Sequence, residues 1–339
     1  MPRFSVVIPV YNRPQELDEL LDSLCRQHYT QFEVIVVDDG SATPCEEVCT
    51  HYVGQLDIHY FYKQNAGPGP ARNYGAQRAK GEYLIILDSD VILPEHYFDE
   101  IVRELDTAPA DAFGGPDRAH DNFTPVQKAI NYAMTSFFTT GGIRGGKKKM
   151  DKFYPRSFNL GIRTDVFRAL NGFAAMRFGE DIDLSIRIFA AGCQCRLFPE
   201  AWVWHKRRAT FRQFFKQVHN SGIARINLYK KYPSSLKLVH CLPAVFTLGV
   251  AVLLLCIIVG LVIPVYWLAI VAAILLAAYG LLILTDAGLR NKSVYIGLLS
   301  VVAAFIQLIG YGTGFLRAFW QRVVLHKDEF QAFRRNFYK

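Results

Sequence analysis

The sequence predicts an α/β domain with a mostly parallel sheet, followed by α-helical transmembrane segments. Two observations support this prediction. Over the first 105 residues, short apolar runs alternate with amphipathic stretches, which is typical of a parallel sheet covered by helices on both faces. After residue 238, three apolar runs are long enough to cross about 30 Å of hydrocarbon. The length of 339 residues also favours two structural units over one.

The predicted strands are apolar throughout, as expected of strands that are buried on both faces. They are Phe4–Val10, Phe32–Val37, Ile58–Tyr62 and Tyr83–Leu87. Helices are predicted to begin at Pro14 and to cover about 43–52, 68–80, 94–105 and 181–191. In the first of these helices, four leucines recur on one face, at positions 17, 20, 21 and 24.

Polar residues follow three of the predicted strands at the point where each strand ends. They are Tyr11-Asn12, Asp38-Asp39 and Asp88-Ser-Asp90. The carboxyl ends of parallel strands meet at one edge of the sheet, where ligands bind in open α/β folds. We therefore expect the functional site at this edge.

The second half of the chain has a different composition. Its apolar runs cover 242–263, 265–284 and 294–316, and only Pro264 separates the first two, which predicts a helical hairpin. The third run contains Gln307 and the segment Gly310-Tyr-Gly-Thr-Gly314. Whether it crosses the membrane completely or re-enters on the same side is left open, with the second arrangement slightly favoured. The expected layout is a catalytic domain at 1–209, an amphipathic basic interfacial segment at 210–237, transmembrane helices at 238–316 and a basic tail at 317–339.

The distribution of charge excludes two classes of protein. A hydrophobic content of 51% excludes a disordered chain. The formal charge of +8 invites a nucleic-acid partner, but it is unevenly spread: residues 1–200 hold 27 acids and 21 bases, and residues 201–339 hold 3 acids and 17 bases. Between Leu238 and Thr285 there is no Asp, Glu, Lys or Arg. This pattern indicates a membrane surface rather than nucleic acid as the partner of the basic residues.

The cysteines and the start of the chain bear on localisation. Seven scattered cysteines, with no second pair to complete a zinc site, indicate reduced thiols in a cytosolic environment. Phe4–Val10 is too short for the apolar core of a signal peptide. We therefore expect a multi-pass protein of the cell membrane with its catalytic domain on the cytoplasmic side.

Asp88-Ser-Asp90 is the first candidate for chemistry. Two carboxylates one residue apart at a strand end can hold Mg²⁺ or Mn²⁺, and the metal then neutralises a diphosphate. A solvated turn is the alternative for this short motif. Asp38 and Asp39 hold the equivalent place one strand earlier, either as turn caps or as acceptors for a base N–H or ribose hydroxyl.

Five motifs together resemble family 2 glycosyltransferases, which are inverting enzymes with the GT-A fold, a Rossmann-like domain. In order and spacing, the matching segments are Pro9-Val-Tyr-Asn12, Val37-Asp-Asp-Gly-Ser41, Gln64-Asn-Ala-Gly-Pro-Gly-Pro-Ala-Arg-Asn73, Asp88-Ser-Asp90 and Gly179-Glu-Asp181. The resemblance covers roughly residues 3 to 210 and implies a nucleotide-diphosphate sugar, with UDP favoured, as the donor.

The resemblance also implies roles for the nucleotide-binding residues. Tyr11 would stack on or border the nucleobase, and Asp39 would hydrogen-bond it. Pro9, Asn12 and Asp38 belong to the same donor-binding set.

Further roles concern the diphosphate and the reacting sugar. By resemblance, Arg72 would lie near the base or diphosphate, and Asp88 would contact ribose or metal-bound water. Asp90 would ligate the metal, and Asp181 would be the catalytic base. Inverting transfer needs such a base to take the proton of the acceptor hydroxyl. A helix N-terminus lowers the pKa of a carboxylate, so the competence of Asp181 would come from closeness to the acceptor.

Three more residues are weaker candidates. Asn159, in Ser157-Phe-Asn-Leu-Gly161, would touch donor or acceptor sugar, with a turn-and-packing role equally open. Glu180 is a lesser sugar contact, since it could be a first-turn acid of a helix. His205, after Trp202-Val-Trp204, would reach the metal or diphosphate, or would otherwise be a surface histidine.

The segment Gly141–Lys149 nearly spells a phosphate-binding P-loop, but Lys148 replaces the hydroxyl residue and no apolar strand precedes it. We reject that interpretation. A mobile basic loop near a phosphate, with Arg144 and Lys147, is one alternative, and a solvated linker is the other.

The predicted function is a membrane-anchored, metal-dependent inverting glycosyltransferase that acts on a membrane-associated acceptor, such as a polyprenyl-linked glycan. A processive polysaccharide synthase is the nearest alternative, weakened because the chain lacks a Gln-x-x-Arg-Trp motif. A non-catalytic, sugar-binding transport subunit is more remote, because the apolar runs lack the charged residues of transport paths. A nucleotidyltransferase would need a Gly-rich basic N-terminal loop, which Val10-Tyr-Asn-Arg13 does not provide.

Overall fold

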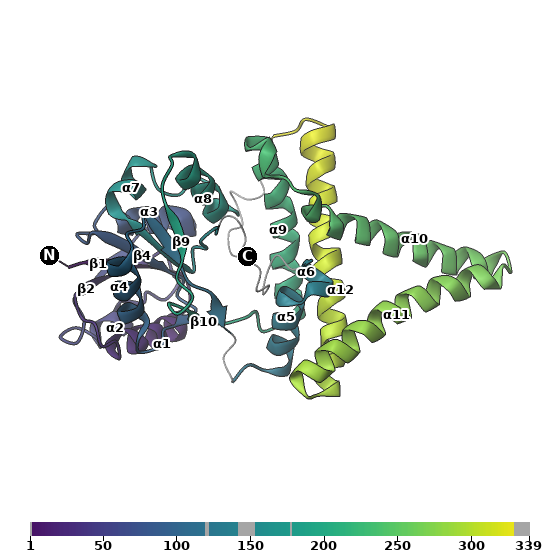
Figure 1. Cartoon of the computed structure of the whole chain (residues 1–339), viewed down its shortest axis with the longest axis horizontal. Coiled ribbons are helices and arrows are strands. Elements are labelled where there is room, and N and C mark those ends of the chain that lie inside the picture. Colours follow the sequence, from purple (N-terminus) through teal and green to yellow (C-terminus); the bar gives the residue numbers. More distant parts are fainter. Residues whose placement is uncertain (1, 119–121, 142–152, 177, 329–339) are drawn as a thin grey trace. The chain divides into compact units, whose positions relative to one another are not determined.

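The computed structural model describes residues 2–118, 122–141, 153–176 and 178–328. The chain divides into two units, which we describe separately (Figure 1). Among the described residues, the first unit comprises 2–118, 153–176 and 178–206, and the second comprises 122–141 and 207–328. The expected catalytic domain is continuous from 1 to 209, whereas residues 122–141 belong to the second unit. The reason is apolar packing, because Ala129, Ile130 and Ala133 join a core cluster that includes Phe214 and Ala303.

The first unit is built on a seven-stranded sheet in the order β3-β2-β1-β4-β8-β6-β9. The strands are β1 (Phe4–Val10), β2 (Phe32–Asp38), β3 (Ile58–Tyr62), β4 (Tyr83–Leu87), β6 (Ala112–Gly114), β8 (Asn159–Arg163) and β9 (Cys195–Leu197). Strands β3, β2, β1 and β4 are parallel neighbours, and β8 is antiparallel to both β4 and β6. The predicted mostly parallel sheet is therefore confirmed.

Successive residues of each strand point to opposite sides of the sheet. Because both sets of side chains are apolar, helices cover both faces. On one face, Val6, Ile8 and Val34 pack with α1 (Pro14–Cys25), α2 (Glu46–Thr50) and α4 (Tyr97–Thr107). On the other face, Val7 and Ile35 pack with α3 (Pro68–Ala76), α7 (Thr164–Ala169) and α8 (Glu180–Ala190). Figure 1 shows the sheet between these two sets of helices.

A small three-stranded sheet lies beside the carboxyl edge of β4. Its order is β5-β10-β7, with β5 at Val91–Ile92, β7 at Asp117–Arg118 and β10 at Val203–His205. Strand β10 pairs antiparallel with β5, with His205 opposite Val91. This pairing returns the chain to the Asp88–Asp90 turn more than a hundred residues after it left.

The second unit is helical. Its elements are α5 (Pro125–Thr135), α6 (Phe137–Thr140), α9 (Phe211–Lys231), α10 (Leu242–Val262), α11 (Tyr266–Asn291) and α12 (Val294–Phe319), followed by a π-helical turn at Trp320–Val324. Two short 3₁₀ turns, Pro233–Ser235 and Leu238–His240, join α9 to α10. Among the described residues, α10, α11 and the helix from Val294 to Val324 are long and apolar enough to span a membrane. In Figure 1, α10 and α11 form a hairpin that turns between residues 262 and 266.

The glycines of α12 allow neighbouring helices to approach its backbone. A Cβ added at Gly314 would lie 2.0 Å from the carbonyl oxygen of His219 in α9. One added at Gly312 would lie 2.4 Å from the carbonyl oxygen of Pro243 in α10. The glycine run of the third apolar segment is therefore where α12 packs against two other helices, α9 and α10.

Candidate active site

The carboxyl edge of the seven-stranded sheet gathers most of the predicted site residues. β1 leads into Tyr11–Arg13, β2 ends at Asp38-Asp39, and β4 leads into Asp88–Asp90. Helix α3 brings Arg72 to this edge, and the first turn of α8 brings Glu180 and Asp181. The site is thus assembled from segments that are up to 170 residues apart in the sequence.

Asp88, Asp90 and His205 form a cluster in which one potential ligand atom of each lies within 4.8 Å of the others. The Nε2 atom of His205 is 3.3 Å from Oδ1 of Asp90. The backbone reinforces this placement, since the N–H of Lys206 donates to the carbonyl oxygen of Asp90 at 3.0 Å. Two carboxylates and an imidazole suit Mn²⁺, and the carboxylates suit Mg²⁺, so the donor set fits the predicted divalent metal.

Arg13 also contacts this cluster, although no motif in the sequence marks it. Its guanidinium Nη1 donates to Oδ2 of Asp90 at 2.5 Å. Burial works against the charge of Arg13, but Asp90 raises its pKa above the ordinary value. The only sequence signal was position, because Arg13 follows Tyr11-Asn12 at the end of β1.

Arg72 links two acidic groups of the site. Its Nη2 donates to Oδ1 of Asp88 at 2.6 Å, and its Nη1 donates to Oε1 of Glu180 at 3.0 Å. The ring centroid of Phe173 lies 5.2 Å from the guanidinium carbon. Burial opposes the charge of Arg72, yet the two carboxylates raise its pKa. Both terminal nitrogens of the Arg72 guanidinium group donate hydrogen bonds, and the single ammonium group of a lysine could not reproduce this geometry.

Glu180 and Asp181 begin helix α8. Burial raises the pKa of Glu180 to about 7, with Arg72 acting against this shift and Asp181 adding to it. Asp181 accepts from the N–H of Ile182 at 2.8 Å through Oδ1, and its Oδ2 is 3.3 Å from Nη1 of Arg156. The Asp181 side chain is 16% exposed. Its carboxylate is thus held by the helix start and still reached by solvent.

Asp38 and Asp39 both hold turns of the chain itself. Asp38 is fully buried and accepts from the N–H groups of Ser41 and Cys45 and from the hydroxyl of Tyr60. Asp39 accepts from the Lys63 ammonium at 2.6 Å and from the N–H groups of Ala66 and Gly67 at 3.0 and 2.7 Å.

Two loop residues and one strand residue complete the predicted nucleotide-binding set. Asn12 has a left-handed backbone with a φ of 52°, and its side-chain oxygen accepts from the N–H of Ala42 at 2.8 Å. This ties the loop after β1 to the loop after β2. Tyr11 is partly exposed beside Asn12, and Pro9 lies within β1 opposite Val37.

Asn159 lies in the core instead of facing the open edge. Its oxygen accepts from the hydroxyl of Tyr97 at 2.7 Å, and its Nδ2 donates to the carbonyl of Ala201 at 2.8 Å. Asn159 is only 2% exposed, as expected if its role is to pack and to hold a turn. The basic loop residues Arg144 and Lys147 lie outside the described residues.

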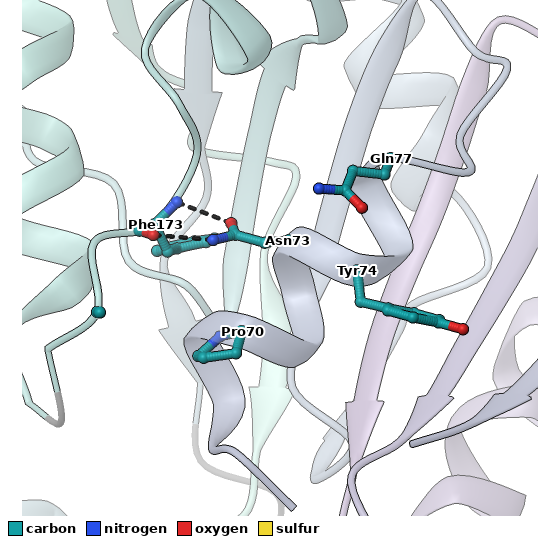
Figure 2. Close-up of a pocket in the computed structure, with 6 residues that line it drawn as sticks. Pro70, Asn73, Tyr74, Gln77 and Phe173 are labelled. Carbon is teal, nitrogen blue, oxygen red and sulfur yellow. Dashed lines mark hydrogen bonds between the residues drawn. The ribbon is translucent and has the colours of Figure 1, made fainter. Parts of the chain in front are cut away.

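A shallow pocket lies on α3 at the side of the site, lined by Pro70, Asn73, Tyr74, Gln77, Phe173 and Ala175 (Figure 2). The Asn73 amide both donates to the carbonyl of Phe173 and accepts from its N–H, each at 2.8 Å. This pair of hydrogen bonds fixes Phe173 next to Arg72. The pocket has no acidic lining, so it supports the site and does not form its centre.

The chain is similar in sequence to known glycosyltransferases. Residues 5–173 match the family model described as glycosyl transferase family 2. Glycosyltransferase GlyG of Streptococcus pneumoniae is 34% identical over 113 residues, which are 33% of this chain and 38% of GlyG. An uncharacterized glycosyltransferase of Rickettsia felis is 33% identical over 137 residues, which are 40% of this chain and 22% of that protein. These matches span well under half the length of either relative.

A solved structure shares the fold over most of the chain. The mannosyltransferase PcManGT from Pyrobaculum calidifontis, in complex with GDP-Man and Mn²⁺, superposes with a TM-score of 0.59 at 17% identity and covers 95% of this chain and 88% of that one. The chain is therefore a member of glycosyl transferase family 2, with a GT-A domain and C-terminal helices apolar enough to anchor it in a membrane.

Proposed function

We propose that the chain is a membrane-anchored, metal-dependent inverting glycosyltransferase. It would move a sugar from a nucleotide-diphosphate sugar to a membrane-associated acceptor, such as a polyprenyl-linked glycan of the cell envelope. The observation that carries the proposal is the cluster of Asp88, Asp90 and His205 at the carboxyl edge of the sheet. A family 2 domain with such a cluster has both a fold and a set of metal-ligand atoms suited to nucleotide-sugar chemistry.

The diphosphate would be bound at this cluster. Asp90 and His205 would hold the divalent cation, with Asp88 contacting it through water or contacting the ribose. When bound, the cation supplies positive charge that stabilises the departing diphosphate. Arg13, held against Asp90 at 2.5 Å, adds a permanent cation beside the same position. Arg72 would keep the Asp88 carboxylate oriented toward the donor.

Asp181 would be the catalytic base. Its carboxylate would take the proton of the acceptor hydroxyl while that oxygen forms a bond to the anomeric carbon from the face opposite the diphosphate. The bond from the anomeric carbon to the diphosphate oxygen breaks, so the configuration inverts. Arg156, 3.3 Å from Oδ2, and the N–H of Ile182 hold the carboxylate in place. Its 16% exposure leaves room for an acceptor to approach.

The nucleobase would lie over the loops after β1 and β2, bordered by Tyr11. A carboxylate offers about four acceptor sites, and Asp39 uses three within the chain, which leaves one for a base N–H. Asp38 is fully buried, which favours a role in shaping the turn over direct contact. UDP remains our preferred nucleotide.

The second unit would bring the acceptor to the active site. Three apolar helices support membrane attachment, and confinement to the same membrane raises the effective concentration of a lipid-linked acceptor. The bases of the 207–237 region would attract anionic headgroups, at up to about 1 kcal/mol per charge. We place the first unit on the cytoplasmic side, where nucleotide sugars are available. Transfer of single sugars is favoured over processive synthesis because the Gln-x-x-Arg-Trp motif is missing.

The test is a panel of nucleotide sugars given to the full chain in membranes, with Mn²⁺ and a lipid extract as acceptor. We expect release of nucleoside diphosphate with one donor, and loss of that release with Asp90→Ala or with a chelator. Asp106→Ala, which changes a surface partner of Arg3, is the matched control and should keep full activity. Turnover that survives both the chelator and Asp90→Ala would remove the metal from the mechanism.

A further inference from the structure

A second group of metal-binding side chains lies at the opposite edge of the same sheet. It consists of Glu33 on β2, His59 on β3 and Asp57 just before β3. One potential ligand atom from each lies within 4.8 Å of the others. Glu33 precedes Asp38 by five residues of an extended strand, so this group lies about 17 Å from the carboxyl edge. The proposed transfer reaction does not use it.

Glu33 is a buried carboxylate with one occupied oxygen. Its side chain is 1% exposed. The Oε1 atom accepts from the hydroxyl of Ser5 at 2.6 Å and from the N–H of Lys80 at 2.7 Å. The buried Oε2 atom has no hydrogen-bond partner and is directed toward His59. A buried polar atom without a partner is costly and calls for an explanation.

The distances between the three side chains suit a shared cation better than direct hydrogen bonds. Nε2 of His59 lies 3.8 Å from Oε2 of Glu33, too far for a hydrogen bond, and 3.2 Å from Oδ1 of Asp57. The buried Nε2 atom also lacks a partner with hydrogen-bond geometry. Tetrahedral zinc with ligand distances of 2.0–2.1 Å places its ligand atoms about 3.3 Å apart. The Glu33–His59 and Asp57–His59 separations, 3.8 and 3.2 Å, fall on either side of that value.

We propose that Glu33, Asp57 and His59 bind a transition-metal dication, with Zn²⁺ as the best match. The imidazole favours such ions over Mg²⁺ or Ca²⁺, and zinc also accepts carboxylate oxygens as ligands. The site is half open because Asp57 is exposed, which leaves a fourth position for water. Its role would be structural, because the metal would join edge strand β3 to its neighbour β2.

The test is calorimetric titration of the detergent-solubilised full chain with Zn²⁺, with excess Mg²⁺ present to compete at the carboxylates of the candidate active site. Glu33→Gln keeps an oxygen for Ser5 and Lys80 and replaces the free oxygen with an amide. We expect Glu33→Gln and His59→Asn each to weaken one Zn²⁺ site at least tenfold. Zn²⁺ should raise the melting temperature of the unaltered chain and have much less effect on either variant.

Two control variants identify other sources of Zn²⁺ binding. His51→Asn changes an exposed histidine outside the cluster and should leave binding unchanged. His96→Asn tests an exposed group in which His28 and His96 both approach Asp99. Binding that is lost only in His96→Asn would overturn the proposal. So would Zn²⁺ binding and protection that are identical in the unaltered chain, Glu33→Gln and His59→Asn, since Glu33 and His59 would then form only a charge pair.

Discussion

The carboxyl edge of the sheet and the glycine-rich faces of α12 are both tightly packed, but different forces hold them. At the sheet edge, Arg72 is buried between Asp88 and Glu180, and Asp90 is held by Arg13. Along α12, Gly312 and Gly314 allow the backbones of α10 and α9 to approach that of α12 closely. The paired charges at the sheet edge set the orientation and the protonation state of the side chains, whereas the glycine contacts set only the distance between helices. The contrast fits the proposal that chemistry resides in the first unit and that the second unit anchors the chain.

The largest expected effect concerns the proposed base. Asp181→Asn keeps the size of the side chain but removes its ability to accept a proton, so we expect turnover to fall by about 10²–10⁴. Donor affinity should stay within about twofold, because the base faces the acceptor. Both are measured on the purified full chain, as initial rates and as donor binding. Asp165→Asn, an exposed acid paired with Arg163, should leave both unchanged. Full turnover by Asp181→Asn would place the base elsewhere.

Arg72 tests whether buried charge holds the sheet edge together. Arg72→Met leaves two carboxylates without their partner, which should lower the free energy of unfolding of the first unit by about 3–5 kcal/mol. Replacing Trp267 and Trp320 with Phe leaves fluorescence from Trp202 and Trp204, both in the first unit. Denaturant unfolding then reports on that unit. Arg26→Met, which breaks an exposed pair with Asp22, should change stability by no more than about 1 kcal/mol. Equal effects of the two variants would contradict the comparison.

Glycine packing gives the matching test in the second unit. Gly314→Ala would push a methyl group against the His219 carbonyl, so we expect a loss of about 1–3 kcal/mol in unfolding free energy. Gly249 in α10 has nothing within 4 Å of an added Cβ, and Gly249→Ala should be neutral or stabilise the helix by up to about 1 kcal/mol. The measurement is unfolding in mixed micelles, with Trp202 and Trp204 replaced by Phe. A harmless Gly314→Ala would mean that α9 and α12 are not packed this closely.

The smallest expected effect is a difference in pH dependence between the units. Burial raises the pKa of Glu180 from 4.5 to about 7, so its contribution to stability is complete below pH 4.5 and is lost as pH rises through 7. Burial, with Arg225 and Lys237, lowers the pKa of His240 from 6.5 to about 4. The contribution of His240 is therefore present above pH 6.5 and lost as pH falls toward 4.

The two contributions are separated by variants. Unfolding of each unit, followed between pH 4 and 7, should depend less on pH in the first unit after Glu180→Gln and in the second unit after His240→Asn. Unaltered pH profiles in either variant would show that these groups titrate normally.

Most of the fold could be predicted because local patterns specify it. Apolar strands such as Phe32–Val37 and the leucines of α1 are buried as their spacing indicates. The grouping of residues 122–141 with the second unit could not be predicted, because the sequence of a short amphipathic helix such as α5 does not indicate which core it joins. The apolar run predicted to end at residue 284 continues as helix α11 to Asn291. The sequence suggested an earlier end because Asp286 is charged, but in the structure Asp286 is paired with Tyr132 and Arg290.

The candidate site shows the same limit. Asp39, Asp88 and Asp90 could be predicted as site residues because they follow predicted strands. The placement of His205 depends on the pairing of β10 with β5, which no periodicity in the sequence indicates. Arg13 and Arg156 were missed because a lone arginine in a loop is common. The core position of Asn159 follows from β8 lying between β4 and β6, which a strand prediction alone does not reveal.

The most direct test of the account is Mn²⁺ binding to the full chain, followed by electron paramagnetic resonance with a nucleoside diphosphate present. We predict one bound Mn²⁺ whose affinity falls at least tenfold in Asp90→Asn and less steeply in His205→Gln, with Asp106→Asn unchanged. Equal Mn²⁺ affinity in all four proteins would contradict the assignment of the sheet edge as the metal and diphosphate site.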